Sequence, residues 1–216
     1  MTAASLSTTA DADPLRVAER WIERVAASGL RRNPSAMALA THGDQGRASV
    51  RMVLLKKLAA DPGYAVFYTN YASRKARELE RCAWAAGVLY WEEYGRQIRI
   101  EGPVVKSPAD ESDAYFASRP LRSQLNAWVS AQSEPLEDPG DLERRADQMA
   151  GDLAAQGASL ARPPFWGGYR LWCEAVELWT EGAGRFHTRL RFERTLTPQS
   201  GGGFAPGPWR SRRLQP

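Results

Sequence analysis

Apolar positions near the start of the chain recur at the spacing of a helix. Asp13 and Pro14 form a typical helix start, because aspartate caps free backbone N–H groups and proline fits the first helical position. The apolar side chains that follow lie mostly three or four residues apart, at Leu15, Ala18, Trp21, Ile22, Val25 and Ala26. The pattern therefore predicts an amphipathic helix that ends before Gly29.

From residue 36 the pattern changes to short runs rich in β-branched and aromatic residues. The runs AMALAT, SVRMVLLKKL and YAVFYTN are separated by the turn-forming segments GDQG and ADPG, which predicts three strands in a meander. The polar run SRKARELERC has the composition of a helix. The runs AAGVLYWEE and RQIRIEGPVV then predict two further strands, joined by a tight turn at Gly95.

The second half of the chain begins with helices and returns to strands. Ser107 and Pro108 open a helical stretch that reaches about Gln132 and is broken at Pro120, and another helix is predicted over 142–156. The segments GGYRLWCEAVELWT, RFHTRLRFER and PWRSRRLQP predict the last strands. This order predicts a mainly β (α+β) fold, a small closed antiparallel barrel flanked by helices, in one domain over 13–216. No GxGxxG segment supports a doubly wound dinucleotide-binding sheet.

Composition and charge narrow the classes of function. The chain has 216 residues, 43% of them hydrophobic, and 29 basic against 25 acidic residues give a formal charge of only +4. Because most arginines lie in patterned, folded segments and no lysine-rich tail is present, we expect small anions rather than nucleic acid as partners. Cys82 and Cys173 lack the spacing of a zinc site or a disulfide framework, so no metal is expected.

The first dozen residues are small and polar, and we expect residues 1–12 to form a disordered N-terminal segment. They contain no apolar core of the signal-peptide type, and no apolar run in the chain is long enough to cross a bilayer. These features predict a cytoplasmic protein without a membrane partner. An organellar transit peptide is the alternative, which the acidic residues of this segment disfavour.

A first cluster of polar residues follows two of the predicted strands. The segment RMVLLK begins with Arg51 and ends with Lys56. The end of the next predicted strand and the start of the following helix contain Tyr68, Thr69, Ser73, Arg74 and Lys75. Hydroxyl, guanidinium, ammonium and helix N-terminal N–H donors together suit a phosphate. The alternative is a solvated basic helix start. Arg51 favours the anion site, because an arginine inside an apolar strand needs a partner.

Two further clusters suit anionic or electron-rich ligands. Tyr115, Arg119 and Ser123 are spaced four apart, and they share a helix face if Pro120 only kinks the helix. The alternative is a satisfied surface arginine beside a half-buried tyrosine. Strand periodicity places Arg185, His187 and Arg189 on one face, which is then either an exposed edge or a binding wall. His187 read alone is equally compatible with a structural histidine.

Taken together, these segments resemble the pyridoxine/pyridoxamine 5′-phosphate oxidase family. The resemblance runs from about Asn33 to Pro216, in family order, through RMVLLK, FYTNYASRKA, RQIRIEG, YFASRPLRSQ, AWVSAQS, PPFWGGYR, ELWTEGAGRFHTR and RRLQP. Each motif is weak alone, and the combination is highly specific. The resemblance implies a split β-barrel of the FMN-binding type and a homodimer that binds FMN in each of two clefts between the subunits.

The resemblance also implies roles for particular residues. FMN contacts are implied at Arg51, Met52, Val53, Leu54, Leu55, Lys56, Tyr68, Thr69, Arg74, Lys75, Gln97, Gln132, Ser133, Trp179 and Arg189. Substrate contacts are implied at Lys56, Tyr115, Arg119 and Ser123 around the phosphate, and at Arg185 and His187 over the pyridine ring. These last two are the implied catalytic residues, which fix the ring and bias its protonation rather than act as nucleophiles.

The implied reaction oxidises pyridoxamine or pyridoxine 5′-phosphate to pyridoxal 5′-phosphate, with O₂ as acceptor and H₂O₂ as product. Two positions depart from the family pattern, which commonly has glycine in place of Asn126 and aspartate in place of Thr188. The segment AAGVLYWEE also resembles the phenazine-biosynthesis relatives of the same fold. An FMN oxidase with a phenazine precursor as substrate is therefore the alternative, and a non-catalytic flavin-binding or nucleic-acid-binding module is a third hypothesis.

Overall fold

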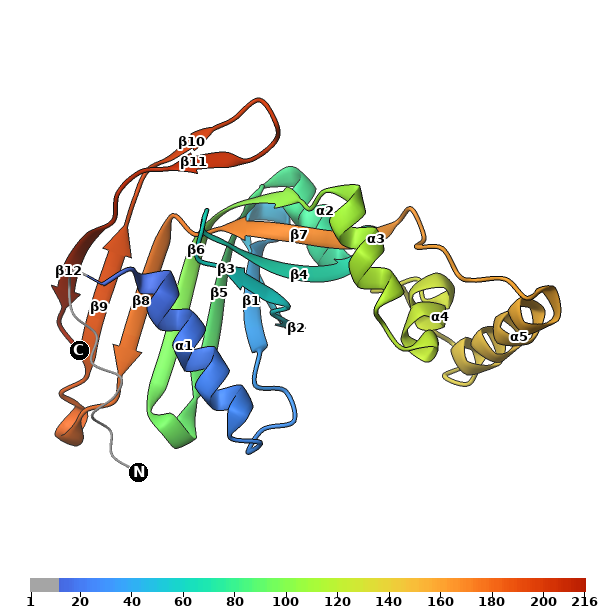
Figure 1. Cartoon of the computed structure of the whole chain (residues 1–216), viewed down its shortest axis with the longest axis horizontal. Helices are drawn as coiled ribbons and strands as arrows, with labels where there is room; N and C mark the ends of the chain where they lie inside the picture. Colours follow the sequence, from blue (N-terminus) through green and yellow to red (C-terminus); the bar gives the residue numbers. More distant parts are fainter. Residues whose placement is uncertain (1–11) are drawn as a thin grey trace.

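The computed structural model of the chain describes residues 12–216, and the N-terminal segment expected to be disordered lies, apart from Ala12, outside the described residues. The first predicted helix is confirmed as α1 (Pro14–Ala27). The carboxylate of Asp13 caps it by accepting hydrogen bonds from the N–H groups of Leu15 and Arg16. The apolar stripe of α1 is buried, and the helix lies across one face of the sheet (Figure 1).

Twelve strands and four more helices follow among the described residues. The strands are β1 (Ala36–His42), β2 (Ala48–Leu54), β3 (Lys57–Ala59), β4 (Tyr64–Asn70), β5 (Trp84–Trp91), β6 (Arg96–Lys106), β7 (Trp166–Trp172), β8 (Ala175–Thr180), β9 (Thr188–Glu193), β10 (Leu196–Pro198), β11 (Phe204–Pro206) and β12 (Arg210–Leu214). The helices are α2 (Arg74–Arg81), α3 (Ala109–Ala117), α4 (Leu121–Val129) and α5 (Asp141–Gln156). The predicted break at Pro120 is therefore confirmed, since it separates α3 from α4.

Ten of the strands form one antiparallel sheet that curls into a barrel, and β10 and β11 form a separate two-stranded sheet (Figure 1). The sheet follows the order β12-β9-β8-β6-β5-β1-β2, and β7, β4 and β3 continue from the far half of β6. The first half of β6 pairs with β8 and its last three residues pair with β7. Among the described strands, β2 pairs only with β1 and β3 only with β4, and the chain itself joins β2 to β3 through Leu55 and Lys56, so the barrel is split at this point.

Three sequence predictions about strands are wrong. β4 pairs with β3 and β7 rather than with β2, so the three-stranded meander is reduced to the β1–β2 hairpin. GGYRLWCEAVELWT forms two strands, because at Cys173 and Glu174 the chain crosses from the partners of β7 to those of β8. The strand predicted from Arg185 begins only at Thr188, and Ala183–Arg185 form a 3-10 turn in which Arg185 has a φ of +68°.

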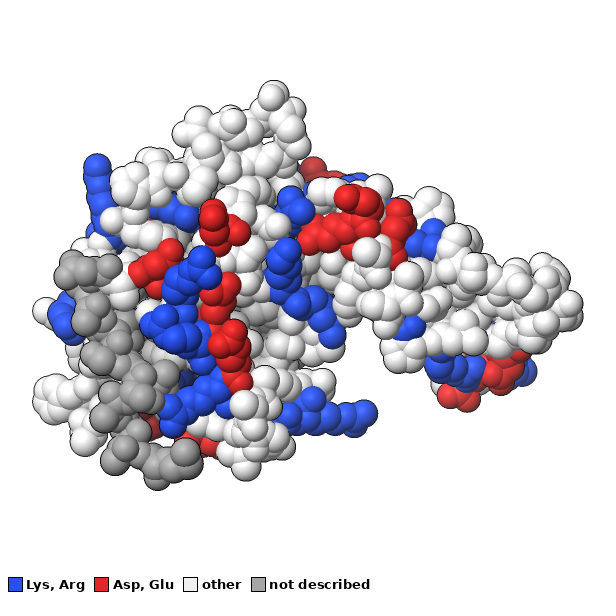
Figure 2. Space-filling model, in the orientation of Figure 1, with Lys and Arg blue, Asp and Glu red and all other residues white. Residues whose placement is uncertain are grey.

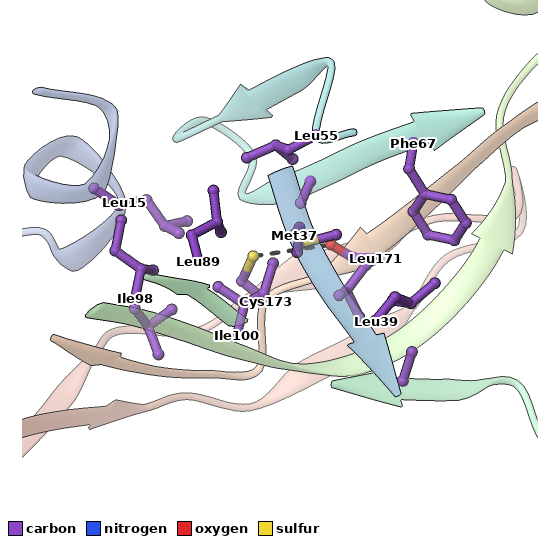
Figure 3. Close-up of a cluster of buried hydrophobic side chains, with 14 of the residues drawn as sticks. Leu15, Met37, Leu39, Leu55, Phe67, Leu89, Ile98, Ile100, Leu171 and Cys173 are labelled. Atoms are coloured by element: carbon purple, nitrogen blue, oxygen red, sulfur yellow. Dashed lines mark hydrogen bonds between the residues drawn. The ribbon is translucent and has the colours of Figure 1, made fainter. Parts of the chain in front are cut away.

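The barrel interior holds the main hydrophobic core (Figure 3). Side chains that alternate along the strands point inward, among them Met37, Leu39, Phe67, Leu89, Ile98, Ile100 and Leu171, and each has at most 1% of its surface exposed. Cys173 lies in the same core, where its thiol is 3.8 Å from the carbonyl oxygen of Leu171. Alternation therefore sorts each strand into a buried inner face and an outer face.

A helical arm extends from the barrel (Figure 1). α3 contacts β7, and α4 contacts α5, whose only buried residue is Ala146. Basic and acidic side chains lie beside one another over the sheet and at the arm, so this face of the molecule has mixed charge (Figure 2). Within residues 12–216 no helix is both long and apolar enough to cross a membrane.

Truncating a core side chain measures how much the barrel depends on this packing. We expect Ile98→Ala to lower the free energy of unfolding by about 2–5 kcal/mol, because it leaves a cavity among fully buried neighbours. Leu30→Ala, at a side chain that is 67% exposed, is the control and should cost less than about 0.5 kcal/mol. Urea unfolding at one fixed protein concentration measures both, and equal losses would contradict the assignment of the core.

Candidate active site

A cavity of about 410 Å³ opens where β2, β4, α3 and α4 meet. Its wall combines one apolar strand edge, an aromatic cluster and hydroxyl, amide and cationic side chains. These residues are Met52, Val53, Leu54, Lys56, Tyr68, Thr69, Asn70, Lys75, Tyr115, Arg119, Pro120, Ser123, Asn126, Ala127, Ser130, Gln132 and Trp166. The second polar cluster of the sequence therefore lines the same cavity as four residues of the first, namely Lys56, Tyr68, Thr69 and Lys75.

Lys75, in the first turn of α2, is the buried cation of this cavity. Its ammonium group donates to Thr69 Oγ1 at 3.0 Å, Ser73 Oγ at 3.2 Å and Gln132 Oε1 at 2.9 Å. Burial, with a contribution from the nearby Arg51, lowers the pKa of Lys75 to about 8. Among the side chains that the structure describes, no carboxylate comes within ion-pair distance of this ammonium group, and Glu78 raises its pKa only in part, so its charge suits an anionic ligand.

Arg51 has the partner that its place in an apolar strand required, and that partner is Glu78. The guanidinium donates through Nη2 to Glu78 Oε2 at 2.9 Å and through Nη1 to Thr41 Oγ1 at 2.5 Å. Arg74 Nε lies 2.8 Å from Glu78 Oε1. Burial alone would raise the pKa of Glu78, but hydrogen bonds from Thr41, Arg74 and Arg51 lower it to about 2. Arg51 thus lies on the inner face of β2, behind the cavity wall.

Three stacked aromatic rings form the other side of the cavity. The Tyr68 ring centroid lies 3.9 Å from that of Tyr115 and 5.6 Å from that of Trp166, and the Tyr115 and Trp166 centroids are 6.2 Å apart, so each ring lies near the other two. Arg119 covers the Trp166 ring at 4.5 Å, and Lys56 Nζ is 5.9 Å from the centroid of Tyr115. Burial lowers the pKa of Arg119, and its Nη1 atom is buried without a hydrogen-bond partner. A buried, unpaired guanidinium nitrogen calls for an anion.

The expected single helix face for Tyr115, Arg119 and Ser123 is wrong, although the three residues do come together. Tyr115 belongs to α3, Arg119 lies between the helices and Ser123 is in the first turn of α4. Pro120 is the N-cap of α4, so the helix ends and restarts instead of bending. The turn between α3 and α4 brings all three side chains to the same cavity wall.

The third cluster forms a separate group on β6, β8 and the start of β9. Gln97 is the register partner of Trp179, and Trp179 is the partner of Arg189. The His187 ring lies 4.6 Å from the Trp179 ring, and its Nδ1 accepts a hydrogen bond from the N–H of Gly182. Arg189 binds Glu177 through Nε and Nη2 at 2.9 and 3.1 Å. Arg185 is exposed in the turn before β9.

This third group is distant from the cavity within one chain but lies on the same face of the sheet. Cross-strand partners share a face, and the pairing places Met52, Ala38, Val88, Arg99 and Glu177 in one row. Met52 and Glu177 are therefore four strand spacings apart, about 19 Å. Trp179 lies two residues beyond Glu177 on this outer face. The residues that the family resemblance implies as contacts of one FMN molecule therefore lie in two separate places in each chain.

Some predicted contacts lie outside the cavity wall, and some wall residues were not predicted. Leu55 is in the core, and Arg51, Arg74 and Ser133 do not line the cavity, although the backbone N–H of Arg74 donates to Ser133 Oγ. The unpredicted residues are Asn70, Pro120, Asn126, Ala127, Ser130 and Trp166 in the wall, and Glu78 behind it. The i, i+4 spacing of Arg74 and Glu78 in a predicted helix was the one available signal for Glu78.

Solved structures of known proteins share this architecture. A structure of PhzG from Burkholderia lata 383, in complex with tetrahydrophenazine-1-carboxylic acid, has a TM-score of 0.80 and 31% identity, covering 100% of this chain and 98% of that one. A pyridoxamine 5′-phosphate oxidase-related, FMN binding protein from Nostoc punctiforme PCC 73102 has a TM-score of 0.69 at 17% identity, covering 98% of this chain and 100% of that one. The fold defines an FMN-binding split-barrel protein, which confirms the predicted class.

Sequence comparisons identify the family within that class. The family model described as pyridoxamine 5′-phosphate oxidase matches residues 25–151, and the pyridoxine 5′-phosphate oxidase C-terminal dimerisation region matches residues 166–216. A pyridoxine/pyridoxamine 5′-phosphate oxidase of Rubrobacter xylanophilus is 46% identical, covering 96% of this chain and 88% of its own. One of Paraburkholderia phytofirmans is 44% identical, covering 86% and 84%. The chain belongs to the pyridoxine/pyridoxamine 5′-phosphate oxidase family.

Family membership confirms three predictions made from the sequence. The protein is an oxidoreductase, its cofactor is FMN, and its C-terminal region is the part through which the family forms dimers. The residues present suit this cofactor, because the cavity offers the uncompensated ammonium group of Lys75 beside the hydroxyl of Thr69 and the amide of Gln132. The roles of individual residues remain predictions.

The buried carboxylate behind the cavity makes stability depend on pH. We expect Glu78→Gln to lower the free energy of unfolding by about 3 kcal/mol at pH 7, because it leaves half-buried Arg51 without its counterion. The folded-state pKa of about 2 is below the ordinary 4.5, so the carboxylate stabilises the fold above pH 4.5 and loses this contribution as the pH falls towards 2.

Urea unfolding of the two proteins at pH 7 and pH 3, at one protein concentration, measures this difference. The gap between wild type and Glu78→Gln should shrink at pH 3 to roughly half its value at pH 7. Glu80→Gln, at an exposed position of the same helix with a long 3.7 Å contact to Lys106, is the matched control and should cost less than about 1 kcal/mol. A gap that is the same at both pH values contradicts the assignment.

Proposed function

We propose that this protein is an FMN-dependent oxidase that converts pyridoxamine or pyridoxine 5′-phosphate to pyridoxal 5′-phosphate. O₂ accepts the electrons and H₂O₂ is released, together with ammonia when the substrate is the amine. The observation that carries the proposal is the pair of uncompensated cations in one cavity, Lys75 on one side and Arg119 on the other. Two such charges suit two phosphorylated molecules, a cofactor and a substrate.

The side of the cavity at the start of α2 is the proposed site of the FMN phosphate. Lys75, Thr69 and Gln132 line the wall there, and the N-terminus of α2 adds free backbone N–H groups. Arg74 and Ser133 flank the same helix start. Arg51 contributes positive charge from behind the wall while its guanidinium is held by Glu78. The strand edge of Met52, Val53 and Leu54 offers an apolar surface to the flavin ring.

The opposite side of the cavity is the proposed site of the substrate phosphate. Lys56, Tyr115, Arg119 and Ser123 all line this side. Arg119 is oriented by its stacking on Trp166, which leaves its Nη1 donor free for a ligand oxygen. Two phosphate sites act as fixed points that determine the distance between the reacting carbon of the substrate and the flavin ring.

When bound, FMN supplies the hydride acceptor for oxidation of the carbon that carries the amine or alcohol. The residues of the chain supply orientation rather than a nucleophile. Arg185 and His187 are proposed to lie over the pyridine ring, where a cation and an imidazole favour the ring protonation state suited to oxidation. The tilted contact with the Trp179 ring restrains the His187 ring, and the Gly182 N–H donor fixes its Nδ1 as an acceptor.

A complete site is proposed to need two chains. The cavity and the Trp179 group lie on one outer face, roughly four strand spacings apart, farther than one flavin ring extends. That face exposes apolar side chains beside the cavity, with Val50 69% and Met52 62% exposed. A two-fold contact through this face brings the cavity of each chain to the Trp179 group of its partner. FMN then lies at the interface of the homodimer.

An FMN oxidase that acts on a phenazine precursor is the second candidate. The 31% identity to PhzG of Burkholderia lata 383, over the whole chain, favours it. The unpaired hydrogen-bond donors of Arg119 and Ser123 suit a phosphate group and therefore favour a vitamin B6 phosphate as the substrate. Relatives named pyridoxine/pyridoxamine 5′-phosphate oxidase, at 42–46% identity, favour the same substrate. We further propose a cytoplasmic location, supported by the free thiols of Cys82 and Cys173.

Purified protein assayed for bound flavin and for turnover tests the proposal. We expect a yellow protein with flavin absorbance that, in air, converts pyridoxamine 5′-phosphate to pyridoxal 5′-phosphate and H₂O₂ in equal amounts. Absence of flavin after incubation with FMN would overturn both candidates. Bound flavin that turns over a phenazine precursor but neither B6 phosphate would select the second candidate.

Mixing two variants tests whether the site is shared between chains. Arg119→Ala disables the cavity of a chain, and Arg185→Ala disables its Trp179 group. Each variant homodimer should therefore have low activity. After the two proteins are unfolded and refolded together, about half of the dimers carry one chain of each kind, and each of these has one intact site of two. We expect recovery of about a quarter of wild-type activity. A mixture no more active than the separate variants would contradict a shared site.

A further inference from the structure

Asn126 lies in α4 one turn after Ser123, and its side chain lines the same part of the cavity as Ser123 and Arg119. The same three residues border a second groove of about 310 Å³ between α4 and α5. Asn126 is exposed and therefore stands at the rim of the proposed substrate phosphate site, on the wall shared by the cavity and this groove. It was not among the site residues expected from the sequence.

The polar side chains of this wall differ from their neighbours in having no partner. Among the described side chains, those of Arg119, Ser123 and Asn126 form no hydrogen bond to another residue. The adjacent polar residues of α4 are engaged, since Gln124 Nε2 donates to the Arg119 carbonyl at 2.8 Å and Arg122 pairs with Asp147. The unpaired donors therefore gather at the turn before α4 and on the face of α4 that borders the cavity.

Asn126 also has no evident structural reason to be in a helix. Asparagine in a helix interior is less favourable than alanine by up to about 0.7 kcal/mol, because its amide competes for backbone hydrogen bonds. Among the described side chains its amide makes no hydrogen bond to a helix end or to α5, whereas its backbone carbonyl accepts one from the N–H of Ser130. A helix-disfavouring amide with free donors beside an uncompensated arginine is suited to binding a ligand.

We propose that Asn126 is a further specificity residue, whose side-chain amide donates a hydrogen bond to the substrate phosphate held by Arg119 and Ser123. This inference rests on the proposed function, since it assigns Asn126 to the same substrate. Arginine, hydroxyl and amide donors then reach the phosphate from one wall, with the amide on its solvent side. An amide adds a directed hydrogen bond without a further charge.

Two substitutions test the inference with different physical effects. Asn126→Ala removes the donor and should raise KM for pyridoxamine 5′-phosphate about 10-fold with little change in kcat, as expected for one hydrogen bond to a charged group. Asn126→Asp keeps the shape but places a carboxylate beside the phosphate, and it should raise KM about 100-fold. Inorganic phosphate, as a competitive inhibitor, should lose affinity in the same order. Flavin content should stay at the wild-type level.

The matched control is Gln148→Glu, which adds one negative charge at an exposed position of α5 outside both cavities. It should leave KM within about 2-fold of wild type, since an exposed distant charge is screened. Melting temperature separates binding from folding, because Asn126→Ala should keep or slightly raise it while KM rises. If Asn126 had a purely structural role, Asn126→Ala would instead lower the melting temperature.

The outcomes separate this inference from the proposed function. If wild type neither binds FMN nor oxidises pyridoxamine 5′-phosphate, the proposed function fails. If wild type is active and Asn126→Asp keeps the wild-type KM and the wild-type inhibition by phosphate, the role of Asn126 is overturned. A loss confined to kcat, with both binding constants unchanged, overturns it equally.

Discussion

The cavity depends on one buried carboxylate. Glu78 projects from α2 towards β1 and β2, where it binds Arg51 and accepts a hydrogen bond from Thr41. The same carboxylate holds Arg74 in the first turn of the helix. These contacts fix α2 against the barrel, and with it the position of Lys75 at the cavity wall. Without these contacts, a helix that starts with the two basic residues Arg74 and Lys75 would be held to the sheet only by the few apolar side chains of a short helix.

Positive charge in this site is arranged in two layers. Arg51 is neutralised behind the wall, whereas Lys75 and Arg119 reach the cavity without carboxylate partners. Keeping one cation paired limits the repulsion among three positive groups, while the other two stay available for ligands. Burial acts against both charges, as the lowered pKa values of Lys75 and Arg119 show. A phosphate in each place would relieve that cost, so ligand binding and stability should be linked.

The sequence predicted the elements better than their arrangement. Helix signals at Asp13 and Pro120 are local, so the first helix and the break between α3 and α4 could be read directly. Strand partners depend on contacts far along the chain, which is why the pairing of β4 with β7 was missed. The residue types of the site were recognisable from their motifs. Their grouping into a cavity and a distant Trp179 group needed the barrel.

Particular residues show why the site was only partly predictable. Arg51 was expected to need a partner, but periodicity could not say whether that partner was a ligand or a carboxylate of the next helix. The spacing of Tyr115, Arg119 and Ser123 predicted that they share one face of a single helix, which the structure does not support. The turn at Pro120 brings them together instead. Asn126 stands out among the described residues only because some nearby polar side chains of α4 have hydrogen-bond partners and its own side chain has none. The spacing of residues in the sequence cannot show this.

The division of β6 between two sets of partners has a consequence for how the chain is made. The strands that pair with its two halves, β7 and β8, are formed by residues 166–180, far behind β6 in the order of synthesis. Until that segment leaves the ribosome, one side of β6 and the edge of β4 present unpaired N–H and C=O groups. Such open edges are templates for pairing with other chains. Barrel closure therefore waits for the last quarter of the polypeptide, and the nascent protein passes through a stage prone to aggregation.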